Sequence, residues 1–191
     1  MTAEAQVLSK EKRAVAVFCG ARKGSDPAFA ELASEVGLAI AERGWLLVYG
    51  GSSVGLMGEL ANAALAAGGE VLGVIPQQLV KKEAGHTGLQ RLEIVVDMPV
   101  RKTRMIDLAD GFLVLPGGFG TLDELFEVVT LRQIGTHAKP IVLCDPGNYW
   151  GPLLAACRGL VDAGLASPKD FDSMEQFRTV AKALDRLGRD G

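Results

Sequence analysis

The chain has 191 residues, of which 48% are hydrophobic and 23% charged, a composition typical of one globular domain with a buried core. The net charge of −3 and the 6% of aromatic residues argue against a basic surface for nucleic-acid phosphates and against aromatic platforms for bases. No apolar run approaches the roughly 20 residues of a membrane span, and the amino-terminal segment lacks the apolar core of a signal peptide. We therefore expect a cytoplasmic protein that binds neither nucleic acid nor membrane.

Six apolar segments rich in β-forming residues alternate with helical patterns along the chain. These segments cover residues 14–19, 45–49, 71–75, 92–96, 111–115 and 140–144. The first intervening helix is indicated by apolar residues that recur on one face, at Phe29, Leu32, Ala33, Val36 and Ile40. This alternation predicts a Rossmann-like α/β fold, in which a doubly wound, mainly parallel sheet carries helices on both faces.

The remainder of the chain completes the expected single domain of residues 1–191. Two helices are predicted to close it, over residues 149–163 and 173–187, and Ser173 and Gln176 have the spacing of a capping box at the start of the second. Residues 76–90 are the longest segment without clear periodicity. We expect an ordered core over about 14–188, with tails at 1–12 and 189–191.

The three cysteines are too far apart to suggest a disulfide framework or a zinc site. Cys19, Cys144 and Cys157 form no C-x-x-C pair, and their number is odd. Each is interpreted as a small core residue, and no metal is predicted.

Three glycine-rich loops follow predicted strands: "CGARKGSDP" from Cys19, "YGGSSVGLMG" from Tyr49 and "LPGGFGTLDE" from Leu115. In a parallel α/β sheet these loops share the carboxyl edge, where ligands bind. Glycine lets the backbone approach a ligand closely, and the N–H groups at a helix start attract anions. The dinucleotide and P-loop fingerprints are both absent. The loops therefore predict an anion site of another type, whereas each alone would fit a tight turn.

Arg101 and Glu124 are the two charged candidates beside this edge. Glu124 closes the T-x-x-E spacing from Thr121, so it fits either a capping box or a catalytic carboxylate. Arg101 lies in the first turn of a helix expected to begin near Pro99, where a cation opposes the helix dipole. Such an arginine suits bidentate binding of phosphate or carboxylate, and the alternative is a salt bridge to Asp97 or Glu124.

The segments "YGGSSVGLMG", "EAGHTGLQRLEIVVDMPVRKTRM" and "LPGGFGTLDELFEVVTLRQIGTHAKP" resemble the LOG-type cytokinin riboside 5'-monophosphate phosphoribohydrolase family from about residue 14 to residue 150. The resemblance implies hydrolysis of the N-glycosidic bond in an N6-substituted adenosine 5'-monophosphate, which releases the free base and ribose 5-phosphate. It also implies a homodimer with sites near the interface, and residues 76–90 are a candidate contribution to those sites.

The same resemblance assigns site residues, with Arg101 and Glu124 as the catalytic pair. It makes the loop from Gly117 to Thr121 the phosphate cradle, Lys102 an added substrate contact and Glu83 the acid of an E-x-x-H segment. The substrate-binding positions it implies are Lys102, Gly117, Gly118, Phe119, Gly120, Thr121, Asp123, Glu83, Gly50, Gly51, Met98 and Thr130. Three positions depart from the family pattern: Pro99 replaces a histidine, Ser52 a glycine and Leu131 a tryptophan.

Other functions remain open at this stage. Related folds carry molybdenum cofactor, and a glycine-lined anion cleft would serve that purpose without catalysis. Another phosphoribosyl compound, or adenosine 5'-monophosphate itself, could also be the substrate. Many relatives are labelled lysine decarboxylase, but that reaction normally uses a pyridoxal cofactor, for which the sequence has no motif. No cofactor is predicted.

Overall fold

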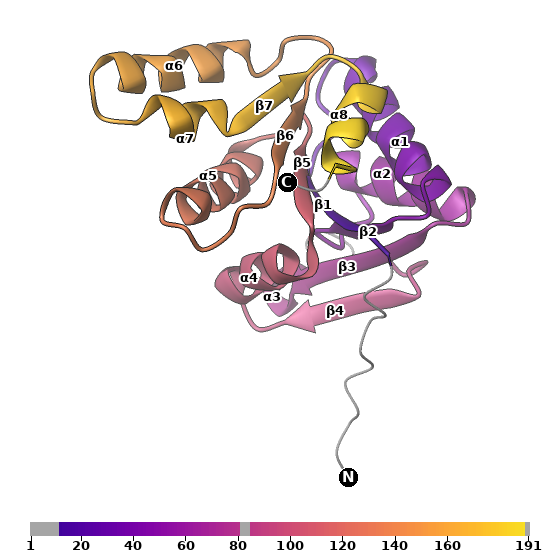
Figure 1. Cartoon of the computed structure of the whole chain (residues 1–191). Helices are drawn as coiled ribbons and strands as arrows, with labels where there is room; N and C mark the ends of the chain where they lie inside the picture. Colours follow the sequence, from indigo (N-terminus) through magenta and orange to yellow (C-terminus); the bar gives the residue numbers. More distant parts are fainter. Residues whose placement is uncertain (1–11, 81–84, 190–191) are drawn as a thin grey trace.

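The computed structural model describes residues 12–80 and 85–189, and its seven strands form one parallel sheet (Figure 1). The strands are β1 (Ala14–Phe18), β2 (Leu46–Tyr49), β3 (Glu70–Pro76), β4 (Arg91–Val95), β5 (Gly111–Val114), β6 (Ile141–Cys144) and β7 (Met174–Phe177). The helices are α1 (Pro27–Glu42), α2 (Gly55–Ala66), α3 (Gln77–Val80), α4 (Met98–Leu108), α5 (Phe119–Gln133), α6 (Gly151–Asp162), α7 (Pro168–Asp172) and α8 (Val180–Leu187). The predicted α/β class is confirmed.

The order of strands in the sheet is β4-β3-β2-β1-β5-β6-β7. The chain first builds outwards from β1 to β4, and then crosses back to add β5 on the other side of β1. The connections that follow β1 and β5 therefore leave the sheet on opposite faces. Such a topological switch point opens a crevice at the carboxyl edge of the sheet, and here it lies between the loops after β1 and β5.

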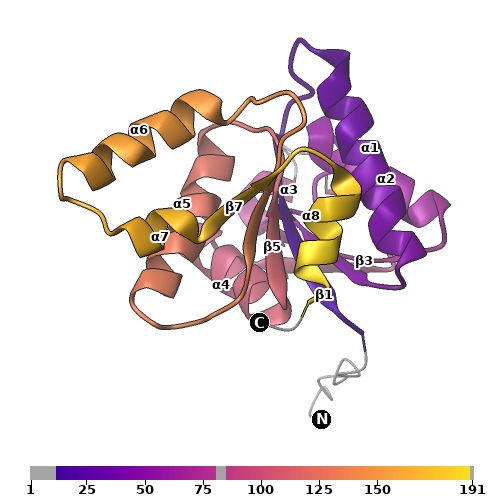
Figure 2. The same ribbon diagram turned by 45° about the horizontal axis from the view of Figure 1, so that its top comes forward.

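Helices cover both faces of the sheet, as expected. Alternate residues of the central strands pack on one side against α1, α2 and α8, and on the other side against α4, α5 and α6 (Figure 2). In β1, for example, Val15 and Val17 face the first group, whereas Ala16 and Phe18 face the second. This period of two explains why the inner strands are apolar throughout, because neither face meets water.

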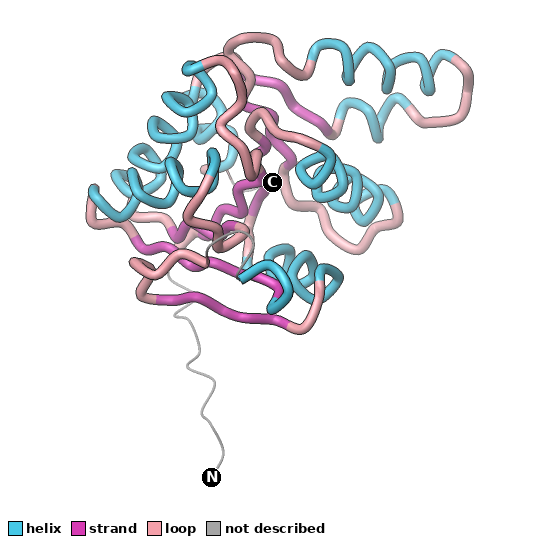
Figure 3. The backbone as a smooth tube through the Cα atoms, turned by 180° about the vertical axis from the view of Figure 1, so that it is seen from behind, coloured by secondary structure: helices cyan, strands magenta, loops and turns pink. Residues whose placement is uncertain are grey.

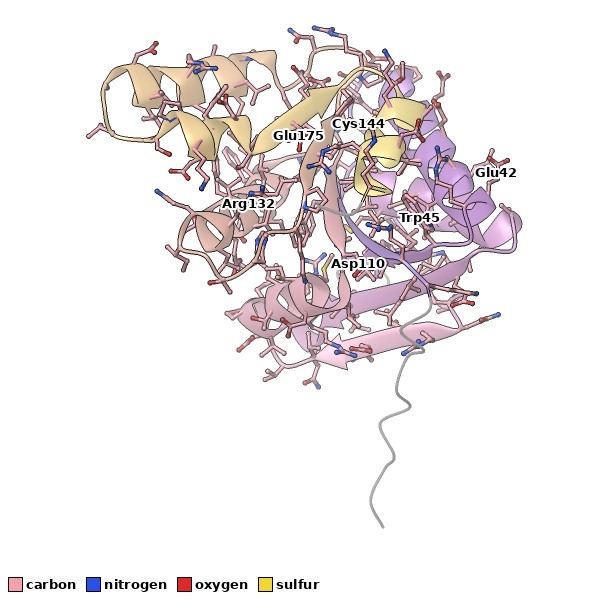
Figure 4. All side chains as sticks on the ribbon, in the orientation of Figure 1. Glu42, Trp45, Asp110, Arg132, Cys144 and Glu175 are labelled. Carbon is pink, nitrogen blue, oxygen red and sulfur yellow. The ribbon has the colours of Figure 1, made fainter. Side chains whose placement is uncertain are left out.

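The amino ends of the parallel strands form one edge of the sheet and the carboxyl ends form the other, and these two edges have different functions. Viewed from behind, the tube in Figure 3 shows the inner strands between the helical layers, with β4 at the margin of the sheet. Asp110 and Trp45, labelled in Figure 4, precede β5 and β2 and therefore lie at the amino edge. There the Asp110 carboxylate accepts a hydrogen bond of 2.8 Å from the Ala14 N–H and ties β1 to the start of β5. The amino edge thus stabilises the fold, and the carboxyl edge carries the glycine loops.

The predicted helix over 173–187 is wrong in its first part. Ser173 ends α7, and the next four residues form β7, which pairs with β6 in the register Ile141 to Met174. The helix begins only at Val180, where the Thr179 side chain accepts a hydrogen bond from the Lys182 N–H. The capping-box spacing misled the prediction because a four-residue edge strand of mixed polarity carries little periodic signal.

The segment without periodicity, residues 76–90, contains the short helix α3 and a carboxyl-terminal part that returns to the sheet. The His86 N–H donates to the Gly51 carbonyl, and the His86 ring accepts from the Gly88 N–H while its Nε2 lies 3.0 Å from the Asn62 Oδ1. Residues 85–88 are therefore held against the loop after β2. Within the described ranges, no helix combines the length and apolar character needed to cross a lipid bilayer.

Candidate active site

The three glycine-rich loops meet at the switch point. The Gly20 N–H donates to the Pro116 carbonyl at 3.2 Å, and the Gly20 carbonyl accepts from the Leu56 N–H at 3.0 Å. This contact between the loops requires glycine, since a Cβ on Gly55 would lie 2.3 Å from the Ala21 carbonyl and Gly55 has a φ of +66°. The expectation that the three loops share one edge is confirmed.

A cavity of about 520 Å³ opens between these loops. Its walls are residues 19–24 after β1, residues 116–121 after β5, and side chains from five helices and one further loop. Those side chains belong to Phe29, Leu56, Met57, Leu79, Met98, Arg101, Glu124 and Tyr149. The cavity thus combines a glycine-lined wall that also carries Arg22 and Lys23, an apolar wall, and the buried pair of Arg101 and Glu124.

Arg101 reaches this cavity from α4. Asp97 is the N-cap of the helix and accepts a hydrogen bond of 2.9 Å from the Val100 N–H, so it does not pair with the arginine as one alternative required. The Arg101 side chain is 7% exposed, and its Nη atoms contact the sulfur atoms of Met98 and Met57 at 3.6 and 4.0 Å. Its buried Nε has no hydrogen-bond partner among the described residues. A buried guanidinium with an unused donor is costly unless a ligand supplies the acceptor.

Gly50 makes room for this guanidinium. A Cβ built on Gly50 would lie 1.8 Å from the Arg101 Nη2 and 2.7 Å from the Met57 Sδ. No rotation of a methyl group relieves such an overlap, so either the arginine or the backbone would have to move. The glycine after β2 therefore determines the position of Arg101 without lining the cavity itself.

Glu124 faces Arg101 from α5. Its Oε1 lies 3.7 Å from the Arg101 Nη2, which makes an ion pair longer than a hydrogen bond. The predicted capping box is not formed, because the N-cap is Gly118 and α5 begins at Phe119. Thr121 is consequently the third helical residue and is buried, and Glu124 lies in the second turn instead of the first. The capping explanation for Glu124 is thereby removed.

The side of α5 that packs on the sheet carries Leu125 and Val128, which are buried, whereas Phe126 is exposed. The helix is therefore rotated so that Glu124 shares the buried sector with Leu125 and Val128. This rotation brings a carboxylate below the surface and beside the cavity.

Cys19 lies at the end of β1 beside the charged pair. Burial raises the pKa of the Cys19 thiol, the negative charge of Glu124 raises it further, and Arg101 acts in the opposite direction. The thiol therefore stays protonated at neutral pH and is a poor nucleophile. All three cysteines are free and buried. Among the described residues, no group of three histidine, cysteine or acidic side chains is placed to hold a metal ion.

The start of α5 presents backbone N–H groups that can bind an anion. The first N–H groups of a helix have no partner inside it, and they carry the positive end of the helix dipole. In α5 these groups belong to Phe119, Gly120 and Thr121, and the first helical bond runs from the Leu122 N–H to the Gly118 carbonyl. Gly118 and Gly120 leave open space where a side chain would begin. This end of the cavity therefore suits a phosphate group.

The structure brings most, but not all, of the predicted site residues together. Arg101, Glu124, Met98 and the segment 117–121 line the cavity. Phe119 stands at its rim and is 92% exposed. Gly50 and Gly51 do not line the cavity, Thr130 is exposed farther along α5, and Glu83 is outside the described residues.

Lys102 and Asp123 pair with each other outside the cavity. The Lys102 Nζ lies 2.9 Å from the Asp123 Oδ2 and 2.5 Å from the Glu127 Oε2. Burial favours the neutral amine, but hydrogen bonds to Glu127 and Asp123 outweigh it and raise the pKa of Lys102. Successive helical residues project about 100° apart, so Lys102 is turned away from the face of Arg101.

The three departures from the family pattern fit the fold locally. Pro99 occupies the first turn of α4, where proline is favoured. Ser52 is fully buried, and its hydroxyl accepts a hydrogen bond of 3.2 Å from the Val54 N–H just before α2. Leu131 packs against the apolar cluster beneath α5. None of the three lines the cavity.

Several lining residues were not singled out from the sequence. Leu56, Met57 and Leu79 form part of the apolar wall, and Phe29 and Tyr149 stand beside the glycine loops. Met57 lies inside the glycine-rich "YGGSSVGLMG" segment. Its position in that segment could therefore have predicted that it lines the site. Tyr149 follows a strand that carries no glycine cluster like the other three, and no local pattern distinguishes it.

The sequence is similar to a known family and to characterised relatives. A family profile described as "Possible lysine decarboxylase" matches residues 57–187. A cytokinin riboside 5'-monophosphate phosphoribohydrolase of Rhodococcoides fascians is 47% identical over 157 residues, which cover 82% of this chain and 79% of that protein. A protein of the same name from Mycobacterium tuberculosis is 46% identical over 91% of this chain and 90% of its own length.

Solved structures share the fold at lower identity. A molybdenum cofactor binding protein from Rippkaea orientalis superposes with a TM-score of 0.70 at 19% identity, covering 94% of this chain and 98% of that one. The molybdenum cofactor carrier protein of Chlamydomonas reinhardtii gives a TM-score of 0.68 at 22% identity, covering 93% and 96%. Sequence identity at this level supports the shared fold alone.

The sequence relatives match nearly the whole length of the described core. The matched region includes the loop after β5, the start of α4 and the charged pair between α4 and α5. The chain therefore belongs to the LOG-type family of cytokinin riboside 5'-monophosphate phosphoribohydrolases, which the profile describes as possible lysine decarboxylases.

Proposed function

We propose that the protein hydrolyses the N-glycosidic bond of adenosine 5'-monophosphate or an N6-substituted derivative, releasing the free base and ribose 5-phosphate. The observation that carries this proposal is the buried Arg101–Glu124 pair, held 3.7 Å apart on a cavity wall next to the start of α5. The names of the sequence relatives support the same reaction.

Cleavage of a glycosidic bond passes through an oxocarbenium-like state, in which positive charge grows on the ribose and negative charge on the leaving base. Glu124, as a carboxylate, stabilises the ribosyl cation and orients the attacking water. Arg101 has a donor at Nε without a partner within residues 12–80 and 85–189, so it can bind the nucleotide and offset charge on the departing purine. Because both groups are buried, their fields are weakly screened by solvent.

The 5'-phosphate is assigned to the start of α5. The N–H groups of Phe119, Gly120 and Thr121 point out of the first turn, and Gly118 and Gly120 leave the space that a phosphate needs. Binding at this remote group positions the glycosidic bond against Glu124, so the phosphate contributes to the rate without taking part in the chemistry.

The base is assigned to the apolar wall formed by Leu56, Met57, Leu79 and Met98. Thioether side chains adapt to flat aromatic ligands and make favourable sulfur–aromatic contacts. The wall contains few groups that could read the exocyclic amine by hydrogen bonding. This composition favours a purine whose N6 position carries an apolar substituent.

We extend the proposal to a homodimer in the cytoplasm. The family resemblance supports the dimer, and so do three exposed apolar side chains on the β4 edge and the start of α4, those of Ile94, Val96 and Val100. Sedimentation equilibrium on the purified protein tests it, and a monomer at micromolar concentration would overturn it.

The reaction is tested by incubating the purified protein with adenosine 5'-monophosphate and with N6-isopentenyladenosine 5'-monophosphate, followed by chromatography of the bases. We expect free base and an equal amount of ribose 5-phosphate, with faster release from the isopentenyl compound. Absence of base from both nucleotides would contradict hydrolysis. In that case tight binding of molybdenum cofactor would support a carrier function instead.

A further inference from the structure

Tyr149 contacts the phosphate cradle from outside the glycine-rich loops. Its hydroxyl donates a hydrogen bond of 2.8 Å to the Gly117 carbonyl, and its ring lines the cavity. The residue is 41% exposed, so the ring is not needed to fill the core. It lies in the connection between β6 and α6, more than 30 positions along the chain from the loop that it contacts.

The backbone around Tyr149 is fixed by a fully buried carboxylate. The Asp145 Oδ1 accepts from the Tyr149 N–H at 2.7 Å, and its Oδ2 accepts from the Trp150 N–H at 2.8 Å and from the Gln176 Nε2 at 3.0 Å. Asn148 adopts a φ of +61°, the only positive value for a non-glycine residue in the described chain. A strained turn and a buried charge are therefore both used to hold this connection in place.

The Tyr149 ring also links the two loops that form the cavity. It packs edge-on against Phe29, with ring centroids 5.4 Å apart, and Phe29 in turn lies under Gly24 of the first glycine loop. Tyr149 thus contacts the loop after β5 through its hydroxyl and the start of α1 through its ring.

We propose that Tyr149 is a positioning residue of the site, which orients the Gly117–Gly118 peptide so that the start of α5 can hold the phosphate. A peptide unit is planar, so the bond to the Gly117 carbonyl fixes the direction of the Gly118 N–H as well. Glycine permits a wide range of backbone φ and ψ angles. A Gly-Gly peptide without such an anchor would therefore sample other orientations. The proposal rests on the proposed function in assigning the phosphate to this loop.

The test compares two removals of a hydroxyl group. Tyr149→Phe deletes the bond to Gly117 and keeps the ring that packs on Phe29. Tyr49→Phe is the matched control, because the buried Tyr49 hydroxyl has no hydrogen-bond partner among the described residues and does not line the cavity. The measurements are the Kd of ribose 5-phosphate by calorimetry, and kcat and KM for adenosine 5'-monophosphate.

We expect Tyr149→Phe to weaken ribose 5-phosphate binding by about 2- to 12-fold, the effect of one hydrogen bond, and to raise KM by a similar factor with little change in kcat. Tyr49→Phe should match the wild type in all three. Unchanged binding in Tyr149→Phe, or a lower kcat at an unchanged KM, would overturn the positioning role, and so would a wild type that does not bind ribose 5-phosphate.

The two proposals fail separately. A wild type that binds ribose 5-phosphate but releases no base would refute hydrolysis, and weaker binding by Tyr149→Phe would still support the positioning role. A wild type that releases base, with a Tyr149→Phe variant that equals it in Kd and KM, would leave the hydrolysis standing and refute the role of Tyr149.

Discussion

The helices α4 and α5 meet through two charged contacts made by neighbouring residues, one on the cavity side and one on the outer side. On the cavity side, Arg101 and Glu124 are buried and stand 3.7 Å apart. On the outer side, Lys102 lies within 2.9 Å of Asp123 and 2.5 Å of Glu127, and both of these acids are more exposed than Glu124. Arg101 and Lys102 are adjacent in α4, and Glu124 and Asp123 are adjacent in α5. The Arg101–Glu124 pair is nevertheless buried and widely spaced, whereas the Lys102–Asp123 pair is close and more accessible.

This difference separates a site from a structural contact. A pair near the surface gains little net stability, because solvent and salt screen its charges, and it needs no ligand. A buried ion pair loses its hydration, and this loss destabilises the fold unless short, well-aligned hydrogen bonds compensate for it. The inner pair lacks that geometry, since the Arg101 Nε has no partner in the part of the chain that the structure describes and the guanidinium rests against sulfur atoms. The buried Arg101 Nε, without a partner among the described residues, is our reason for proposing the inner contact as the functional one.

Exchange of one carboxylate on each side gives the largest expected contrast. Glu124→Gln keeps the shape of the side chain but removes the charge that stabilises the ribosyl cation, so kcat should fall by about 100- to 1000-fold. Glu127→Gln removes a carboxylate from the outer contact of the same helix and should leave kcat near the wild-type value. Chromatography of released base measures both. Equal losses in the two variants would show that the comparison does not distinguish site from scaffold.

Displacing Arg101 without changing it gives the next largest effect. Gly50→Ala puts a Cβ 1.8 Å from the Arg101 Nη2, and the resulting shift of the guanidinium should lower kcat/KM by up to about 100-fold. Overpacking should also reduce the free energy of unfolding by about 1 to 3 kcal/mol. The matched control is Gly159→Ala, because Gly159 has open space around it in α6. If Gly50→Ala retained full activity, Arg101 would not need its observed position.

The outer contact should show the smallest effect. Lys102→Gln removes both of its ion pairs, and the free energy of unfolding in urea should fall by no more than about 1 kcal/mol. Base release should be close to that of the wild type, because Lys102 does not line the cavity. A rise in KM for the nucleotide would instead restore the substrate contact that the family resemblance implies for this lysine.

The sequence predicted the parts of this protein that depend on local pattern. Continuous apolar runs such as the one before Cys19 predicted inner strands, because a strand covered on both faces has no polar side. The edge strand β7 was missed, since four residues of mixed polarity show neither period clearly. The start of α5 was placed too late for a similar reason: Thr121 and Glu124 have capping-box spacing, but Phe119 and Gly120 before them already take helical positions.

The candidate site was predicted in composition but not in arrangement. Alternating elements and three glycine loops determined a parallel sheet with an anion site at one edge, because strand direction alone brings those loops together. Only the tertiary structure decided that Arg101 faces inwards while Lys102 does not, that Gly50 makes space for a guanidinium, and that Tyr149 holds the Gly117 carbonyl. These depend on how each helix is rotated and how far apart the elements pack. Rotation and spacing come from contacts between residues distant in the chain, which no local pattern records.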